Sequence, residues 1–204
     1  MIYDISMTVH PDMAVYKNKP EKKPVFTVVR TFAKEGGYET DVSMNLHTGT
    51  HVDYPLHVLE DGDNSDTENL ETLIGEAMVL DLSHVKTAIT ADDLKSYAVK
   101  PDSFVLLKTV NSETDAFDFD FVYLAEDAAR HLAACKVRGV GIDALGIERN
   151  QAGQPTHKAL LKQGIVILEG LRLATVREGY YTMICLPLKI QGVEASPARV
   201  ILTE

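Results

Sequence analysis

Cysteine and tryptophan are scarce in this sequence, which has two cysteines, Cys135 and Cys185, and no tryptophan. A disulfide framework or a cysteine-based zinc site needs more cysteines at closer spacing, so we expect neither. Long apolar runs are also missing, because no segment approaches the roughly 18 to 20 residues that span a bilayer. The first residues lack the basic segment and the apolar stretch of a signal peptide. We therefore expect a cytoplasmic protein with no membrane partner.

An excess of positive charge is missing as well. Lys and Arg total 20 against 30 Asp and Glu, which gives a formal net charge of −10 at pH 7. Phosphate backbones are bound by clustered Lys and Arg, so we expect no nucleic-acid partner. The hydrophobic fraction of 45% and the charged fraction of 25% are those of a globular protein. With 204 residues and no repeat or flexible linker, the chain is expected to form a single domain over residues 1–204.

Short apolar runs of strand length alternate with a few helical segments. Strands are expected over residues 2–7, 25–32, 38–46, 77–82, 104–109, 137–142, 164–168, 181–188 and 199–202. Gly36-Gly37 predicts a hairpin between the second and third of these strands. Helices are expected from Thr90, where Asp93 completes a capping box, over 124–134, and over 156–162 with Thr156 as N-cap. Many strands and few helices predict an α/β or α+β fold around a mixed sheet.

Three of the seven histidines and one aspartate fall within eleven residues: His47, His51, Asp53 and His57. In an extended strand, His47, His51 and Asp53 would point to the same face, because side chains alternate with a period of two. Pro55 ends the run and predicts a turn that carries His57. Imidazole and carboxylate ligands suit Zn, Mn, Fe or Co, and no thiolate lies nearby. An isolated histidine is usually exposed or structural, but this grouping favours a divalent metal site.

The run His47-Thr-Gly-Thr-His51-Val-Asp53-Tyr-Pro55-Leu-His57 resembles the HxGTHxDxPxH signature of the cyclase-like metal-dependent hydrolases. This family includes bacterial kynurenine formamidase (arylformamidase) and isatin hydrolase. The likeness extends over most of the chain, through residues 3–6, 141–148, 157–171 and 196–199. The resemblance implies a fold of the swivelling β/β/α type, with a mixed sheet at its core and few helices.

The resemblance also implies which residues bind metal. A first ion would be bound by His47, His51 and Asp53. A second ion would be held by His157 and Glu169 and bridged by Asp53; whether one or two ions bind stays open. Zn is the expected ion, with Mn as the alternative. The assemblies common in this family imply a homodimer or a homotetramer.

The implied reaction is hydrolysis of a carbon–nitrogen bond other than a peptide bond, in an N-formyl amide such as an arylformamide or in a cyclic amide. A bound metal ion lowers the pKa of water from about 15.7 to about 7 and stabilises an oxyanion as a Lewis acid. His57 would act as the proton shuttle to the leaving nitrogen. Two other interpretations stay open: a lactonase, dehydratase or cyclase on the same metal site, and a metal-binding protein without catalysis.

The missing tryptophan is a departure from kynurenine formamidase. That enzyme carries a tryptophan in a V-W-P-G-D stretch, where this sequence has Ala14-Val-Tyr16-Lys17-Asn-Lys19-Pro20. We therefore expect Tyr16 to be the substrate-binding residue, because its ring can still stack on an aromatic substrate. Lys17 and Lys19 are interpreted either as contacts for an anionic small-molecule substrate or as solvated surface side chains. The change leaves N-formylkynurenine an open question as substrate.

Overall fold

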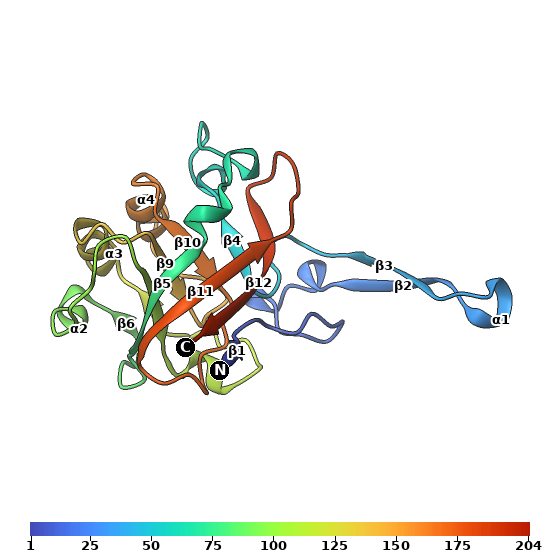
Figure 1. The fold of residues 1–204 in the computed structure, drawn as a ribbon, viewed down its shortest axis with the longest axis horizontal. Coiled ribbons are helices and arrows are strands. Elements are labelled where there is room, and N and C mark those ends of the chain that lie inside the picture. Colours follow the sequence, from blue (N-terminus) through green and yellow to red (C-terminus); the bar gives the residue numbers. More distant parts are fainter.

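The computed structural model describes residues 1–204, and its main feature is a sheet of eight strands (Figure 1). In spatial order these are β1 (Ile2–Asp4), β12 (Ala195–Thr203), β11 (Gly179–Pro187), β5 (Ile74–Asp81), β7 (Phe104–Lys108), β9 (Gly139–Ile142), β10 (Val166–Glu169) and β4 (His51–Asp53). Strands β5, β7, β9 and β10 are parallel to their neighbours within that group, and the other pairings are antiparallel.

The sheet closes on itself because β4 also pairs with β12. Strand β12 has nine residues, which is long enough for β4 to pair with residues 195–197 and β1 with residues 201–203. Strand β11 takes residues 198–203 on the other edge. The short strand β4 is therefore held between β10 and β12, which fixes the direction of its side chains.

Alternate residues of the parallel strands pack into two hydrophobic clusters. Leu80 and Leu107 pack in one cluster with the helices α2 (Ala91–Leu94), α3 (Glu126–Ala134) and α4 (Pro155–Leu161), which lie on one side of the sheet in Figure 1. Val79 and Leu106 pack in the other cluster with Val52 of β4. Each fully buried aliphatic side chain contributes about 1.5 to 3 kcal/mol, so both faces of the sheet stabilise the fold.

The remaining elements are short. A separate parallel pair is formed by β6 (Ala88–Ile89) and β8 (Tyr123–Leu124). The 3₁₀ helices span Tyr16–Asn18, Pro20–Lys22, Pro55–His57, Ser65–Thr67, Leu70–Thr72 and Val110–Glu113. No helix combines the length and the apolar composition that a membrane span requires.

The expected fold class, a mixed α/β sheet with few helices, is confirmed. The capping box of Thr90 and Asp93 is present at the start of α2. Three expected strands are too long: the strand expected over 2–7 ends at Asp4, the one over 25–32 at Arg30, and the one over 38–46 at Ser43. The chain turns just after Ser43, where the side chain of Asn45 accepts a hydrogen bond from the backbone N–H of His47 at 3.1 Å.

Two helix starts also differ from the expectation. Thr156 is not an N-cap: Pro155 begins α4, and the Thr156 hydroxyl donates to the carbonyl oxygen of Leu124 at 2.9 Å. The helix expected over 124–134 begins at Glu126, because residues 123 and 124 pair with β6 instead.

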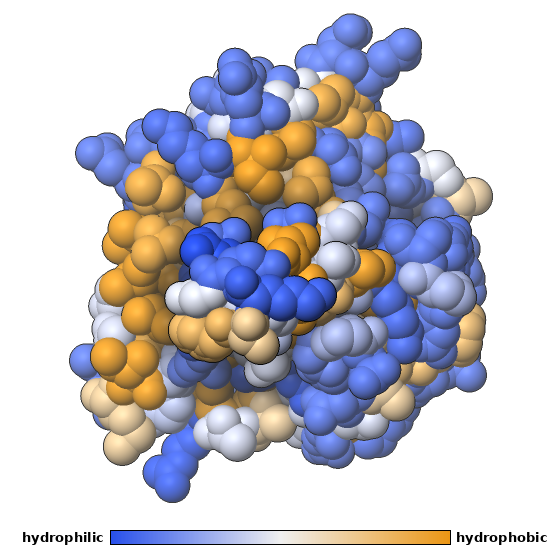
Figure 2. Space-filling model, turned by 90° about the vertical axis from the view of Figure 1, so that its right-hand side faces the viewer, coloured by the Kyte–Doolittle hydropathy of each residue, from blue (hydrophilic) through white to orange (hydrophobic).

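Strands β2 (Val25–Arg30) and β3 (Glu39–Ser43) form the expected hairpin, and Figure 1 shows that it projects from the body as an arm. The four-residue helix α1 (Phe32–Glu35) forms the tip of this arm, residues 25–43, and ends at Gly36 with a φ of 67°. Its large apolar side chains are exposed: Val25, Phe26, Val28, Val29, Phe32, Tyr38 and Val42. Figure 2 looks onto the end of the arm and shows apolar side chains on the body beside it.

Candidate metal centre

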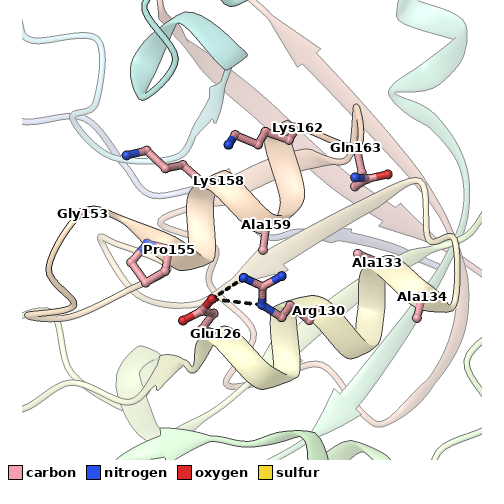
Figure 3. A pocket seen from close by; sticks show the side chains of 10 residues that line it. All are labelled: Glu126, Arg130, Ala133, Ala134, Gly153, Pro155, Lys158, Ala159, Lys162 and Gln163. Carbon is pink, nitrogen blue, oxygen red and sulfur yellow. Dashed lines mark hydrogen bonds and ion pairs between the residues drawn. The ribbon is translucent and has the colours of Figure 1, made fainter.

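A wide hollow of about 560 Å³ lies between α3 and α4 (Figure 3). Its one carboxylate, Glu126, is already bound by the Arg130 guanidinium at 2.6 and 2.9 Å. Lys158 and Lys162 complete its charged side chains, and no histidine lines it. The hollow brings together no set of metal ligands, so we do not assign the functional site to it despite its size.

Strand β4 places His51 and Asp53 on one face of the sheet, as their spacing predicts, and buries both. In the antiparallel pairing of β4 with β10, His51 lies opposite Glu169. Paired residues of neighbouring strands point to the same face, so Glu169 joins the two. The Nε2 atom of His51 lies 3.4 Å from Asp53 Oδ1 and 3.4 Å from Glu169 Oε2.

His47 reaches the same cluster from a turn, so the segment from His47 to Asp53 is not one extended strand. Residues 46–50 form turns and bends, and Gly49 has a φ of 74°. The hydroxyl of Thr50 donates to the carbonyl oxygen of Gly170 at 2.5 Å, which ties the turn to the end of β10. A Cβ atom on Gly170 would lie 2.4 Å from the carbonyl oxygen of Gly49, so this close approach requires glycine.

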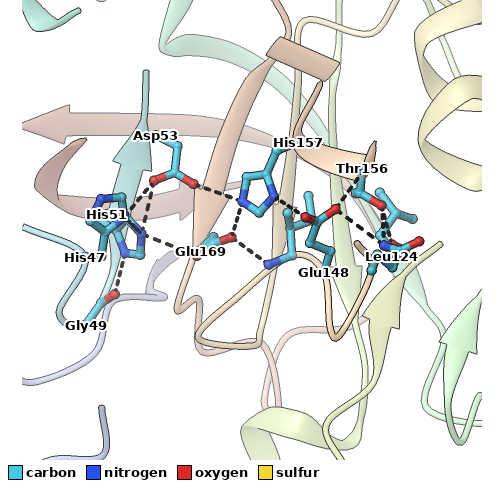
Figure 4. A network of polar contacts seen from close by, with 11 residues as sticks. His47, Gly49, His51, Asp53, Leu124, Glu148, Thr156, His157 and Glu169 are labelled. Carbon is cyan, nitrogen blue, oxygen red and sulfur yellow. Dashed lines mark hydrogen bonds and ion pairs between the residues drawn. The ribbon is translucent and has the colours of Figure 1, made fainter. Parts of the chain in front are cut away.

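The first three expected ligands present their donor atoms at spacings that suit a single ion (Figure 4). His47 Nδ1 lies 3.2 Å from His51 Nε2 and 3.0 Å from Asp53 Oδ1, and the third distance, His51 Nε2 to Asp53 Oδ1, is 3.4 Å. Ligand atoms about 2.0 to 2.1 Å from a tetrahedral zinc ion lie about 3.3 to 3.4 Å from one another. The triangle of donor atoms therefore has the size that a divalent cation requires.

A second set of donor atoms lies on the other side of Asp53. His157 Nε2 is 3.7 Å from Asp53 Oδ2 and 3.4 Å from Glu169 Oε1. Asp53 thus turns one oxygen to each set, as Figure 4 shows. All five residues expected to bind metal come together, from two strands, a turn and a helix; their roles as ligands stay predictions.

Asp53 is buried without the hydrogen bonds that a buried carboxylate normally accepts. Neither of its oxygens has a hydrogen-bond partner, although the imidazoles of three histidines approach within 3.7 Å. The ring nitrogens thus lie near the oxygens without the alignment of a hydrogen bond. A buried charge without such partners costs several kcal/mol. A cation between the nitrogens and the oxygens would remove this cost, so the residues present fit a metal ion.

The carboxyl groups of the cluster are held ionised. Burial raises the pKa of Asp53, but His157, His47 and His51 outweigh it and lower that pKa well below its usual range. Burial and the charge of Asp53 raise the pKa of Glu169, and His157 and His51 lower it to about 2. Burial lowers the pKa of His51, but Asp53 and Glu169 raise it to about 10. Without a metal ion this imidazole is protonated at neutral pH, and a binding cation must displace the proton.

Outer contacts fix the orientation of the candidate ligands. His51 Nδ1 lies 2.9 Å from the carbonyl oxygen of Gly49, so a proton on Nδ1 leaves Nε2 free for a metal. Glu169 Oε1 accepts the backbone N–H of Ile147 at 2.6 Å. His157 Nδ1 lies 3.2 Å from Glu148 Oε1, a charge contact without the alignment of a hydrogen bond, while Nε2 faces Asp53 and Glu169.

Sequence reasoning missed the role of Glu148. It lies in the segment 141–148 that carries part of the resemblance, but neither its spacing nor its neighbours mark it as a partner of His157. A glutamate in a loop nine residues before a predicted ligand is a weak signal. The contact depends on the path of the loop between β9 and α4, which is visible only in the structure.

A cavity of about 350 Å³ opens onto the cluster, and His57 and Tyr16 line it. His57 is carried by the 3₁₀ turn that begins at Pro55, as expected. Its ring centroid lies 4.3 Å from that of His47 and 5.4 Å from that of His157. Burial lowers the pKa of His57, so its imidazole is neutral at pH 7 and able to accept a proton.

Tyr16 lies at the same cavity, where it was expected to contact substrate. Its ring packs edge-on against Phe117 and Phe121, with centroids 5.5 and 6.3 Å away. Burial raises the pKa of its phenol, so the side chain is neutral. A half-buried ring fixed by two others offers a rigid wall to a ligand.

The comparison with known proteins agrees with this geometry. The model of the Cyclase family matches residues 3–149. The chain belongs to the Cyclase family. It is 34% identical to the kynurenine formamidase of Salinibacter ruber over 206 residues, which cover 100% of this chain and 97% of that one. The kynurenine formamidase of Erythrobacter litoralis is 33% identical over 100% of this chain and 94% of its own.

Solved structures of similar proteins have the same fold. A structure described as a potential metal-dependent hydrolase with cyclase activity is 49% identical, with a TM-score of 0.93 over 99% of this chain and 96% of that one. A predicted metal-dependent hydrolase from Bacillus stearothermophilus is also 49% identical, with a TM-score of 0.91 over 99% and 97%. Isatin hydrolase A from Labrenzia aggregata, at 24% identity, has a TM-score of 0.88 over 99% and 93% and shares the fold.

Proposed function

We propose that this chain is a metal-dependent hydrolase of carbon–nitrogen bonds other than peptide bonds. The observation that carries the proposal is the convergence of imidazole and carboxylate donors on both oxygens of one buried, otherwise unsatisfied aspartate, Asp53. The similarity to kynurenine formamidases supports an N-formyl amide, such as an arylformamide, or a cyclic amide as substrate. Zn is the proposed ion and Mn the alternative, because imidazole and carboxylate ligands accept both.

The proposed ligands divide into two sets. His47, His51 and Asp53 hold one ion, and His157 and Glu169 with Asp53 hold a second where two bind. A divalent ion, when bound, supplies Lewis acidity to the carbonyl oxygen and lowers the pKa of water. The protein contributes a preorganised frame, because β4 pairs with β10 and the Thr50 hydroxyl of the turn at 46–50 donates to the carbonyl oxygen of Gly170.

His57 is the proposed proton shuttle. It lines the cavity between the rings of His47 and His157, and its lowered pKa leaves it neutral and ready to take a proton. In the proposed reaction it accepts a proton from the attacking water and gives one to the leaving nitrogen as the carbon–nitrogen bond breaks. Tyr16 forms the wall against which the organic part of the substrate lies.

A panel of substrates tests this function on zinc-loaded protein. We expect turnover of formanilide or of an aromatic lactam, lost on chelation and restored by Zn or Mn. His57→Ala should lower kcat by about 10²- to 10⁴-fold with unchanged metal content. His84→Ala is the matched control, because His84 is exposed and does not line the cavity. Unchanged turnover in His57→Ala would contradict the proton-shuttle assignment.

A lactonase, dehydratase or cyclase is the second candidate function. One observation favours it: a solved relative of 49% identity is described as having cyclase activity. The same panel separates the two functions, because turnover of lactones or esters without any amide or lactam hydrolysis would support this candidate. Metal binding with no turnover of any panel member would support a binding protein without catalysis.

We also propose that the chain assembles as a homodimer, with a homotetramer as the alternative, through the arm at residues 25–43. Phe26 and Val42 pair across its two strands and so share one face with Val28, and all three are exposed. A two-stranded hairpin is marginally stable alone, and exposed apolar faces mark interaction sites. A second copy of the chain can bury this apolar face, because in a symmetric dimer each copy covers the arm of the other.

Light scattering coupled to size exclusion tests this assembly. We expect a mass above the 22.5 kDa of one chain, falling to 22.5 kDa in a Phe26→Asp, Val28→Asp variant. Lys34→Glu, an exposed change at the arm tip, should leave the mass unchanged. A monomeric wild type would refute the proposal.

We further propose that residues 1–204 act as one functional unit. The cytoplasmic location expected from the sequence stays a prediction.

A further inference from the structure

Two lysines stand beside the ring of Tyr16 at the cavity that opens onto the candidate metal centre. Lys17 and Lys22 both line that cavity, whereas Lys19 does not. Their ammonium nitrogens lie 5.3 and 5.6 Å from the centroid of the Tyr16 ring. Of the two lysines that the sequence offered as contacts for an anionic substrate or as solvated side chains, only Lys17 lies at the cavity, and Lys22 lies there with it.

Neither ammonium group is neutralised by the protein. Lys95, Lys100 and Lys108 pair with carboxylates at 2.5, 2.9 and 3.2 Å, but Lys17 and Lys22 make no ion pair and donate no side-chain hydrogen bond. An ammonium group without a counterion in the protein attracts an anion from solution. The pair therefore leaves room for an anion that comes from outside the chain.

The backbone fixes both lysines relative to the metal centre. Lys17 has a φ of 58°, in the left-handed region that lysine rarely adopts, inside the 3₁₀ turn Tyr16–Asn18. The carbonyl oxygen of Lys22 accepts a hydrogen bond from the Thr48 hydroxyl at 2.8 Å, and Thr48 follows the candidate ligand His47 in the turn. Strained and anchored backbone of this kind is often found at ligand sites.

We propose that Lys17 and Lys22 form a subsite for an anionic group, a carboxylate, on the substrate of this hydrolase. The inference rests on the proposed function, because the metal centre would hold the scissile amide while the lysines hold the carboxylate. The Tyr16 ring forms the cavity wall beside the lysines and would contact the organic part of the substrate. The substrate class is therefore a formamide or cyclic amide whose organic part carries a carboxylate. The carboxylates of Glu148 and Glu169 also line the cavity, but they contact histidine rings and backbone N–H groups, and neither forms an ion pair with Lys17 or Lys22.

Positional isomers of formamidobenzoate test the subsite. The ortho, meta and para isomers are each compared with the matching carboxamide on zinc-loaded wild type, Lys17→Met, Lys22→Met and the double variant. Removing an exposed charge near a carboxylate weakens its binding by about fivefold. We expect the best carboxylate isomer to exceed its carboxamide in kcat/KM, and each single variant to raise KM about fivefold for the carboxylate alone.

The control variant is Lys19→Met, which removes an exposed lysine outside the cavity and should change neither probe. Binding of the same probes by calorimetry keeps the test independent of turnover. Lysine-dependent binding of the carboxylates without hydrolysis would uphold the subsite and count against the proposed reaction. Hydrolysis of both members of each pair at equal kcat/KM, or a carboxylate preference that survives in the double variant, would overturn the subsite and leave the hydrolase intact.

Discussion

Replacing Glu148 with glutamine should weaken metal binding without unfolding the protein. Glu148 is buried; its Oε1 lies 3.2 Å from His157 Nδ1, and its Oε2 accepts the backbone N–H of Thr156 at 2.8 Å. Glutamine has nearly the same volume but one acceptor oxygen instead of two. The variant keeps the contact to either Thr156 or His157 and loses the other, and His157 loses its anionic partner in both cases.

The size of the effect follows from that lost partner. Removing the carboxylate that orients a metal-binding histidine typically lowers affinity by about 10- to 100-fold, which equals about 1.4 to 2.7 kcal/mol. If the glutamine turns its amide toward the Thr156 N–H instead, a buried donor is left unpaired at a cost of about 1 to 3 kcal/mol of folding free energy. Affinity and stability can therefore be affected together, and both should be measured.

Zinc affinity is measured by competition with a chromophoric chelator, and the melting temperature of the metal-free protein by calorimetry. Glu126→Gln is the matched control, because Glu126 forms an exposed pair with Arg130 on α3, and such pairs contribute at most about 1 kcal/mol. We expect unchanged affinity in the control. A Glu148→Gln variant that binds zinc within about twofold of wild type would refute the reasoning, because His157 would then need no partner.

Two further predictions concern the frame of the site and its protons. Gly170→Ala should cost at least about 1 kcal/mol and reduce metal binding, because the new Cβ would meet the carbonyl oxygen of Gly49 at 2.4 Å. Gly164 has the same left-handed backbone conformation, but open space surrounds the position of its Cβ atom. Gly164→Ala should therefore lower the stability of the fold and leave metal binding unchanged. Because the pKa of His51 is raised to about 10, zinc affinity should increase about tenfold per pH unit between pH 6 and 8, and a flat profile would contradict this. In the metal-free protein, the stabilisation of the fold from His51 is complete below pH 6.5 and is lost as the pH rises toward 10. The pKa of Glu169 is lowered to about 2, so its stabilisation of the fold is complete above pH 4.5 and is lost as the pH falls toward 2.

Much of the metal centre could be predicted from the sequence because its core is local. His51 and Asp53 are two residues apart, so the period of a strand alone places them on one face, and β4 does so. The turn that carries His57 follows from Pro55. His157 and Glu169 could be predicted only through the resemblance to a family, since they reach Asp53 from more than a hundred residues away.

The parts that could not be predicted depend on long-range pairing and on loop paths. The closure of the sheet needs β4 to pair with β12, and Asp53 to lie opposite Ala195, which no local pattern specifies. The hairpin was predicted from Gly36-Gly37, but its projection from the body was not. Alternating apolar residues predict that one face of a strand is covered, and they do not specify whether the same chain or another chain covers it. The place of Lys22 at the cavity depends on its bond to Thr48, between segments that are separate in sequence.

Metal content after equilibrium dialysis against zinc tests the central claim most directly, in wild type beside Asp53→Ala and Glu169→Ala. Asp53 presents an oxygen to each set of donor atoms, so its loss should remove all bound metal. Wild type should hold one or two equivalents, and Glu169→Ala should lose one of them where two are bound. A wild type that binds no zinc or manganese, or an Asp53→Ala variant that retains a full equivalent, would contradict the account.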